Sequence, residues 1–265
     1  EQQLLAALTG LAKDALHRLE EAEVAHVVGL VEHRDADVRE VEVGLADEAD
    51  TRAAAWGDFD ADGHLDLYVG FSRRANLPNR LYRNEGDGRA FTDVAASRQL
   101  VSTGETRQPS WIDFDRDGDV DLSVALGDPP TALFRNDGQR FTEVAETLGL
   151  ADPRKTVGAS WFDFDQDGDL DVYVANQDGT LNGLFRNDGA KFSDVAPQLK
   201  IDAAGHARTG SNGPSVADYD NDGDFDLFVA NYGPNLLFRN EGRGTFTEVA
   251  TSAGVGGGQK PTRSN

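Results

Sequence analysis

The sequence of 265 residues contains no cysteine and no methionine. Without cysteine the chain forms no disulfide and has no thiol for catalysis. The cysteine content therefore does not indicate whether the protein is intracellular or exported. It also contains no run of about eighteen apolar residues, so no transmembrane helix is predicted. Because position 1 is Glu rather than Met, we expect a processed product or a segment, from which a signal peptide could have been removed.

Basic residues are scarce as well. The chain has 25 Lys and Arg against 47 Asp and Glu, which gives a formal net charge of −22. Nineteen of the acidic residues lie in four segments of nine residues, and these segments together carry −18, with Arg116 counted as +1. No basic stripe is available to displace counterions, so we expect no nucleic-acid partner.

The four acidic segments, called here Asp loops 1 to 4, each fit D-x-D-x-D-G-x-x-D. They are DFDADGHLD at 58–66, DFDRDGDVD at 113–121, DFDQDGDLD at 163–171 and DYDNDGDFD at 218–226. Calcium prefers six to eight oxygen ligands at short range. Carboxylates at positions one, three, five and nine, with the carbonyl at position seven, can surround one ion, and the Gly suits a tight turn. We therefore predict four calcium sites.

The predicted ligands follow from this spacing, and the residue at position seven contributes its main-chain oxygen. They are Asp58, Asp60, Asp62, His64 and Asp66 in loop 1; Asp113, Asp115, Asp117, Asp119 and Asp121 in loop 2; Asp163, Asp165, Asp167, Asp169 and Asp171 in loop 3; and Asp218, Asp220, Asp222, Asp224 and Asp226 in loop 4.

An EF-hand loop begins with the same residues, but it needs a Glu at position twelve and flanking helices. Position twelve here is valine in every loop: Val69, Val124, Val174 and Val229. The segments that contain these valines, such as LDLYVG and FDLFVA, alternate and are rich in β-branched and aromatic residues, which is typical of strands. The Asp loops are therefore predicted to lie inside β-hairpins.

A second motif follows each Asp loop and reads, in loop order, LYRNEGDGRAFTDVA, LFRNDGQRFTEVA, LFRNDGAKFSDVA and LFRNEGRGTFTEVA. Its Asn-Asp-Gly or Asn-Glu-Gly predicts a tight hairpin turn. Four strands per unit follow; in the second unit we expect them at 109–113, 120–126, 131–136 and 140–145. A period near fifty residues with four short strands is typical of propeller blades. The predicted fold is all-β: a β-propeller of four complete four-stranded blades plus a partial blade, within residues 27–250.

The flanking segments differ from the repeats. Apolar residues at three- and four-residue spacing predict an amphipathic α-helix in residues 1–26, which either caps the propeller or docks a partner. Residues 27–45 match the last two strands of a blade. Residues 201–213 form an insertion, either a tolerated polar loop or part of a functional face. The tail, 251–265, begins like the linkers between blades, with Val255 in the place of Leu100. We expect an open arc within a larger propeller or assembly rather than a five-bladed ring closed by this tail.

The paired motifs over residues 27–250 resemble the FG-GAP/VCBS repeats of calcium-binding β-propellers, and in particular the proteins related to cartilage acidic protein (ASPIC/UnbV). This resemblance implies an extracellular propeller, with more blades than the four complete units found here.

Catalytic patterns are missing from the sequence. The same Asp set recurs four times, whereas a catalytic pair is needed once, and the five His residues show no HxxxH or HxH spacing. Three Trp residues, Trp56, Trp111 and Trp161, precede Asp loops, where they suit packing between blades or stacking on sugars. We therefore expect a non-enzymatic, calcium-binding, secreted or periplasmic module for protein interaction. The alternative is a carbohydrate-binding propeller, accessory to a larger polysaccharide-active protein.

Overall fold

The structure is a computed structural model that describes residues 51–257, except 76, 87, 128–129 and 205–209. The chain divides into two units, Glu1–Glu42 and Val43–Asn265. The predicted helix at 1–26, the partial blade at 27–45 and the end of the tail lie outside the described residues. The choice between an open arc and a closed ring depends on those segments, so it stays a prediction.

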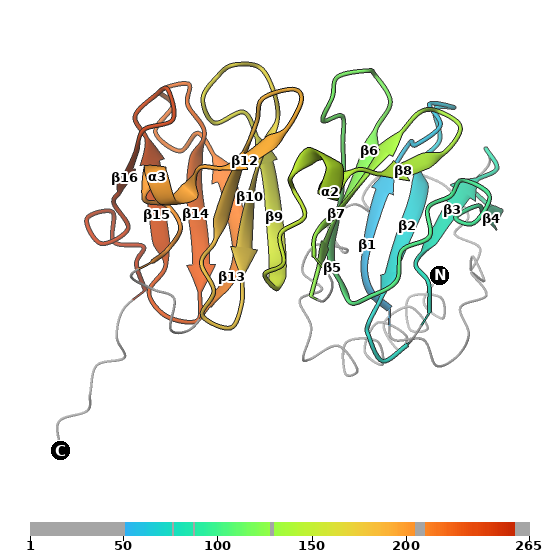
Figure 1. The fold of residues 1–265 in the computed structure, drawn as a ribbon, viewed down its shortest axis with the longest axis horizontal. Helices are drawn as coiled ribbons and strands as arrows, with labels where there is room; N and C mark the ends of the chain where they lie inside the picture. The colour runs from blue at the N-terminus through green and yellow to red at the C-terminus, as the bar shows by residue number, and fades with distance from the viewer. Residues whose placement is uncertain (1–50, 76, 87, 128–129, 205–209, 258–265) are drawn as a thin grey trace, which may run out of the picture. The chain divides into compact units, whose positions relative to one another are not determined.

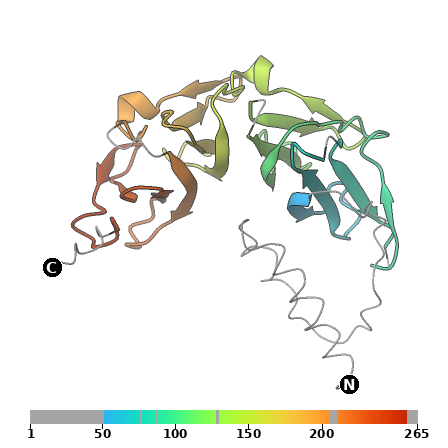
Figure 2. The same cartoon turned by 90° about the horizontal axis from the view of Figure 1, so that it is seen from below.

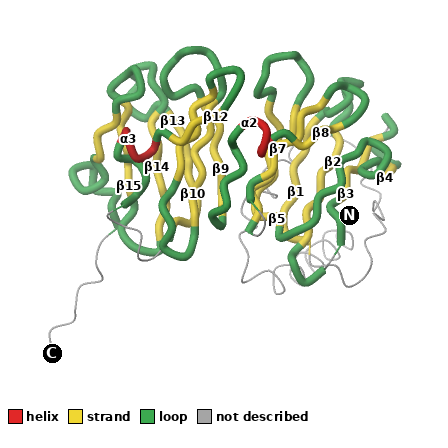
Figure 3. Tube along the Cα trace, in the orientation of Figure 1, coloured by secondary structure: helices red, strands yellow, loops and turns green. Residues whose placement is uncertain are grey.

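The described residues form four antiparallel sheets of four strands each, joined in chain order (Figures 1 and 3). We call each sheet a blade. Blade 1 consists of β1 (Thr51–Gly57), β2 (Asp66–Phe71), β3 (Arg80–Asn84) and β4 (Phe91–Asp93). Blade 2 consists of β5 (Thr106–Ile112), β6 (Asp121–Leu126), β7 (Ala132–Asn136) and β8 (Phe141–Glu143). Blade 3 consists of β9 (Thr156–Phe162), β10 (Asp171–Asn176), β11 (Gly183–Asn187) and β12 (Phe192–Asp194). Blade 4 consists of β13 (Ser211–Ala217), β14 (Asp226–Asn231), β15 (Leu236–Asn240) and β16 (Phe246–Glu248).

In blades 1 to 3 the second strand is the most buried element of its sheet, and like the third strand it pairs with a strand on both sides. All six residues of β6 and all six of β10 are buried. The apolar runs of the sequence therefore correspond to the inner positions of each sheet. This confirms the prediction of an all-β fold with four complete four-stranded blades.

The fourth strand is shorter than predicted. In blade 2 the expected strand at 140–145 ends at Glu143, and a helical turn, α2 (Ala145–Leu148), follows. Blade 3 has the same turn, α3 (Ala196–Leu199). The Glu143 side chain accepts a hydrogen bond from the N–H of Ala145 (2.9 Å) and so turns the chain out of the sheet. The sequence did not predict this change, because Val144 and Ala145 are both apolar and also suit the end of a buried strand.

The hydrophobic core lies between the sheets. Within residues 51–257 as described, it consists of three clusters of buried side chains, one at each junction between successive blades. The first strand of each blade also contacts the first strand of the next, in the order β1, β5, β9 and β13. Figure 2 shows the same sheets from below, each followed by the next along the chain. Each blade therefore shares its core with its neighbours, as in other repeat proteins.

The start of the tail makes the same backbone hydrogen bond as the linker after blade 1. The N–H of Val255 donates to the carbonyl of Ala250 (2.9 Å), as that of Leu100 does to Ala95 (2.9 Å). Residues 251–257 thus repeat the turn that leads from one blade to the next.

Candidate metal centres

Each Asp loop connects the first and second strands of its blade, as predicted. The glycine at position six has φ between +89° and +96° in all four loops, a conformation that a side chain at that position would strain. The carboxylate at position one lies beneath this turn; in loop 1, Asp58 accepts hydrogen bonds from the N–H groups of Asp62 (3.1 Å) and Gly63 (2.9 Å). The sequence thus curls the loop around its own first carboxylate.

The aspartate at position nine anchors the loop to the rest of the blade. In loop 2, Asp121 accepts hydrogen bonds from the N–H of Phe114 (3.1 Å) and the N–H of Asn136 (2.8 Å). The same two bonds recur in the other loops, at 2.8 to 3.1 Å. The position-nine side chains are fully buried or nearly so. Each one therefore joins the loop, the second strand and the third strand.

The structure brings three of the predicted carboxylates together in every loop. In each group, one oxygen of every member lies within 4.8 Å of the others: Asp58, Asp60 and Asp62; Asp113, Asp115 and Asp121; Asp163, Asp165 and Asp171; and Asp218, Asp220 and Asp226. These four groups are compatible with calcium because they offer only carboxylate oxygens.

The remaining predicted residues take other positions. At position five of every loop, one oxygen accepts a hydrogen bond from the N–H at position seven, as Asp117 does from Asp119 (2.9 Å). At position seven the Asp169 side chain is used elsewhere, in an ion pair with Arg116 of the previous loop. The side chain of His64, the residue at position seven of loop 1, is exposed. The carbonyl at position seven stays a predicted ligand.

Three of the loops contain a buried carboxylate oxygen with no hydrogen-bond partner among the described residues. These atoms are Oδ1 of Asp60, Asp113 and Asp165. A buried acceptor without a partner is costly, and a cation bound among the carboxylates would supply the missing contact. The donor set and these orphaned oxygens therefore fit a bound calcium ion.

The electrostatics point the same way. Burial raises the pKa of Asp121 to about 7 and that of Asp171 to about 7, against the lowering effect of their backbone hydrogen bonds. Burial also raises the pKa values of Asp115 and Asp165, and the adjacent carboxylate at position five adds to the rise. Crowded, desolvated carboxylates repel one another, and a divalent ion neutralises them.

Sequence reasoning missed the asparagine that ends each third strand. Asn136 donates its backbone N–H to Asp121 and its side-chain amide to the carbonyl of Phe59 in the previous blade (2.8 Å). Asn187 and Asn240 repeat both bonds. The sequence did contain a sign of this role, because Asn recurs in all four copies of the second motif. It was attributed only to the turn, where the Asn side chain does accept the N–H of the turn glycine, for example in Asn136 and Gly138 (3.0 Å).

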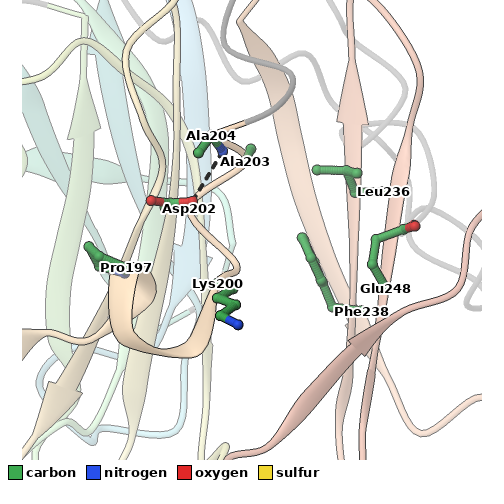
Figure 4. Close-up of a pocket in the computed structure, with 8 residues that line it drawn as sticks. All are labelled: Pro197, Lys200, Asp202, Ala203, Ala204, Leu236, Phe238 and Glu248. Carbon is green, nitrogen blue, oxygen red and sulfur yellow. Dashed lines mark hydrogen bonds between the residues drawn. The ribbon is translucent and has the colours of Figure 1, made fainter.

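A separate cavity of about 360 Å³ lies between blades 3 and 4, away from the Asp loops. Its lining residues are Pro197, Lys200, Asp202, Ala203, Ala204, Leu236, Phe238 and Glu248 (Figure 4). The two carboxylates in this lining are already engaged: Asp202 accepts the N–H of Ala204 (3.1 Å) and Glu248 that of Ala250 (2.7 Å). The cavity adjoins the start of the insertion at 201–213, whose residues 205–209 lie outside the described residues.

The repeats match a known protein family. The model of the FG-GAP-like repeat matches residues 58–124, 113–174, 163–229 and 218–264. Each matched segment begins at the first aspartate of an Asp loop, and the first three extend into the second strand of the next blade, so successive matches overlap at the Asp loops. No curated protein matches the chain.

Two solved structures show a distant likeness. A lectin of Agrocybe aegerita that recognises non-reducing terminal N-acetylglucosamine is 17% identical, with a TM-score of 0.44 over 79% of this chain and 56% of the lectin. The V. cholerae biofilm matrix protein Bap1 is 14% identical, with a TM-score of 0.43 over 75% of this chain and 30% of Bap1. The match thus spans about half the length of the lectin and under a third of Bap1. Separately, no helix in the described part of the chain is long and apolar enough to cross a membrane.

Proposed function

Because the chain belongs to the FG-GAP-like repeat family, we propose that it is a non-enzymatic β-propeller module, stabilised by calcium, that binds a protein partner outside the cell. The observation that carries the proposal is the fourfold recurrence of a clustered carboxylate group at the same place in every blade. The closer relation to cartilage acidic protein stays a prediction, since the family match concerns the repeat alone.

Calcium would be held at each loop by the carboxylates at positions one, three, five and nine and by the carbonyl at position seven. The bound ion would neutralise the charge that accumulates in the loops. In loop 2 its ligands would include Asp113, whose buried Oδ1 has no hydrogen-bond partner in the described part of the chain. Asp121 would then link the ion to the second and third strands through its two backbone hydrogen bonds. Loading the loop would therefore stabilise the whole blade.

The location outside the cell follows from calcium supply. Sites of the weak, extracellular class bind with constants of about 10⁻⁴ to 10⁻³ M and would stay largely empty in the cytosol. Sheets fixed by ion-loaded loops present a rigid surface of connecting loops, which suits the binding of a large partner. Such a surface makes the module a scaffold or interaction platform.

Two observations support a non-enzymatic role. The carboxylate groups recur in four copies, whereas glycoside hydrolysis needs one unique pair of acid and base. His64, the one histidine among the described residues, is exposed at position seven of loop 1. It lies beside Gly86 of the turn in its own blade.

Calorimetric titration of the intact chain with calcium tests the proposal. We expect four ions per chain and a lower melting temperature in EDTA. At about 1 mM calcium and a site constant near 0.1 mM, each site contributes about 1.4 kcal/mol, or roughly 6 kcal/mol for four sites. Asp115→Ala and Asp117→Ala should each weaken one site and make residues 113–121 sensitive to protease. Glu146→Gln, which removes an exposed carboxylate outside the loops, is the control. Unchanged melting in EDTA would refute the proposal.

The alternative function, carbohydrate binding, rests on an exposed aromatic side chain. Tyr232, which follows β14, is 63% exposed, and aromatic rings at such positions suit stacking against apolar faces of ligands. A glycan array probed with the intact chain, Tyr232→Ala and Tyr232→Phe separates the two functions. Binding that is lost in the Ala variant and kept in the Phe variant would support the glycan. No bound glycan, together with capture of a protein from the extracellular fraction in calcium, would support the protein partner.

A further inference from the structure

Asp loop 1 differs from the other three loops in the carboxylates that it brings together. In loops 2 to 4 the cluster joins positions one, three and nine, whereas in loop 1 it joins positions one, three and five, which are Asp58, Asp60 and Asp62. Position nine is the first residue of the second strand, while position five lies in the turn of the loop itself. The cluster of loop 1 therefore lacks the member that the sheet fixes in the other loops, and a ligand set that must be ordered on binding binds less tightly.

Loop 1 also faces a positive charge that comes from the linker to blade 2. Nη2 of Arg98 lies 3.7 Å from Oδ2 of Asp60, and its Cζ lies 5.2 Å from the ring centroid of Phe59. Nη1 of Arg98 donates to the carbonyls of Gly138 and Gln139, in the turn between β7 and β8 (2.9 and 3.1 Å). The guanidinium is therefore held from both blades, and it can leave the loop only by breaking these contacts.

The other described junctions have an aliphatic residue at this place. Two residues before the buried end of the linker, where blade 1 has Arg98, blade 2 has Leu148 and blade 3 has Leu199. Both leucines pack against the core clusters of their junctions. Each loop also lies in the field of an arginine from the third strand of its own blade: Arg83, Arg135, Arg186 and Arg239. Those arginines recur in every repeat, so the guanidinium from the linker is what distinguishes loop 1.

The charges of the loops point in the same direction. Loop 1 has four aspartates, because His64 takes position seven, whereas loops 2 to 4 have five each. Arg116 also contacts a neighbouring loop, but its partner is Asp169, whose side chain is not among the predicted ligands. Arg98, in contrast, contacts a position-three carboxylate that the ion would need. Loop 1 therefore offers calcium the least negative charge of the four.

We propose that Arg98 makes loop 1 the weakest of the four calcium sites, so that it fills last. The inference rests on the proposed function, since it concerns the ions that the Asp loops would bind. A guanidinium in contact with one of the ligands repels a divalent ion, and screening is limited because the side chains of Arg98 and Asp60 are only 22% and 12% exposed. Arg98 also bonds to the turn of blade 2, so loading loop 1 would act on the contact between blades 1 and 2. This junction would then respond to calcium at concentrations that already fill the other three sites.

Calorimetric titration of the intact chain with calcium, resolved into separate binding steps, tests this inference. We expect three tighter ions and one that binds roughly tenfold more weakly, the order expected for a like charge nearby at the surface. Arg98→Leu, which installs the residue of blades 2 and 3, and Arg98→Gln should each tighten the weak site by about tenfold. Arg98→Lys, which keeps the charge, should leave it weak. Arg107→Leu is the matched control. Its side chain is also 22% exposed, and it lies near the start of β5, at the end of this strand away from Asp loop 2; it should leave all four sites unchanged.

A pair of substitutions at position five assigns the weak step to a loop. Asp62→Asn should remove the weak step and leave three tight ions, whereas Asp117→Asn should remove a tight one. With the unaltered chain, this pair decides the question even where circular dichroism shows that an Arg98 variant does not fold. Four equal sites would overturn the inference and leave the proposed function intact. So would a weak step that belongs to another loop, or one that neither Arg98→Leu nor Arg98→Gln tightens. A chain that binds no calcium would refute both.

Discussion

The two inner blades and the two outer blades carry the same motifs in different surroundings. Position nine of the Asp loop is a buried aspartate with the same two backbone hydrogen bonds in all four blades. Yet burial raises the pKa to about 7 in Asp121 and Asp171 of blades 2 and 3, and raises it less far in Asp66 and Asp226. The inner loops have a described blade on both sides, and that added protein removes more water from the carboxylate.

This difference teaches that a blade's chemistry depends on its neighbours as well as on its motif. An identical nine-residue pattern gives a more desolvated site between two blades than at the end of the described series. The comparison between inner and outer blades can be tested by removing a contact that only the inner blades have, or by adding such a contact to an outer blade.

The largest effect is expected from the aromatic residue at position two. Phe164→Ala removes a buried ring from the junction between blades 3 and 4 and should lower the free energy of unfolding by about 3–5 kcal/mol. Tyr219→Ala removes the equivalent but exposed ring of blade 4 and should cost the monomer less than about 1 kcal/mol. Urea denaturation at low protein concentration measures both. Equal losses would show that the outer face is covered.

Position nine should give the next largest effect. Asp121→Asn replaces one acceptor oxygen by an amide donor and leaves one of two buried N–H groups unpaired, at a cost of about 1–3 kcal/mol. Asp226→Asn should cost less, because the adjacent Tyr219 is exposed and water can reach its N–H. Denaturation in calcium-free buffer isolates this structural role from ligand loss. A larger loss in Asp226→Asn would contradict the comparison.

The pH dependence of stability should reveal the contribution of the position-nine aspartates in blades 2 and 3. The pKa values of Asp121 and Asp171 are about 7 in the folded chain, above the ordinary value of 3.8, so the folded state binds more protons than the unfolded state between about pH 4 and 7. Their contribution is thus present at low pH and lost as pH rises through 7. Without calcium, the unaltered chain should lose more stability over this range than the Asp121→Asn/Asp171→Asn double variant. Thermal melts at each pH measure the difference, and parallel curves would refute it.

The smallest effect concerns the contact between neighbouring loops. Arg116 at position four of loop 2 pairs with Asp169 at position seven of loop 3, and Gln166 makes the equivalent bond to Asp224 (2.6 Å). Loop 1 has Ala61 at this position, with nearly the same φ as Arg116, 54° against 57°. Ala61→Arg should pair with Asp119 and add about 0.2–1 kcal/mol, less at high salt. Thermal melts with and without added salt measure the gain. Adding Asp119→Asn should cancel it, and a gain that survives that change would exclude the pairing.

The sequence by itself determined the repeat, the four Asp loops and the strand character of the segments after them. These features are local: the period of the aspartates, the glycine at position six and the alternation of apolar residues act within one blade. The carboxylates that cluster in the structure are therefore among the ligands predicted from the spacing of the aspartates. The short helices α2 and α3 were not predicted from the sequence, because an apolar pair suits a strand and a helical turn equally well.

Only the tertiary structure decided what each repeated residue contacts. The Asn of the second motif was readable as a turn residue, but its bond to the previous blade joins residues such as Asn136 and Phe59, which are far apart in sequence. The three tryptophans precede their Asp loops in the same way, yet Trp111 stacks on a neighbouring blade while Trp56 is half exposed. Burial, and with it the pKa of a carboxylate, depends on which blades lie on either side. The motif does not encode that difference, because position nine is Asp in every repeat.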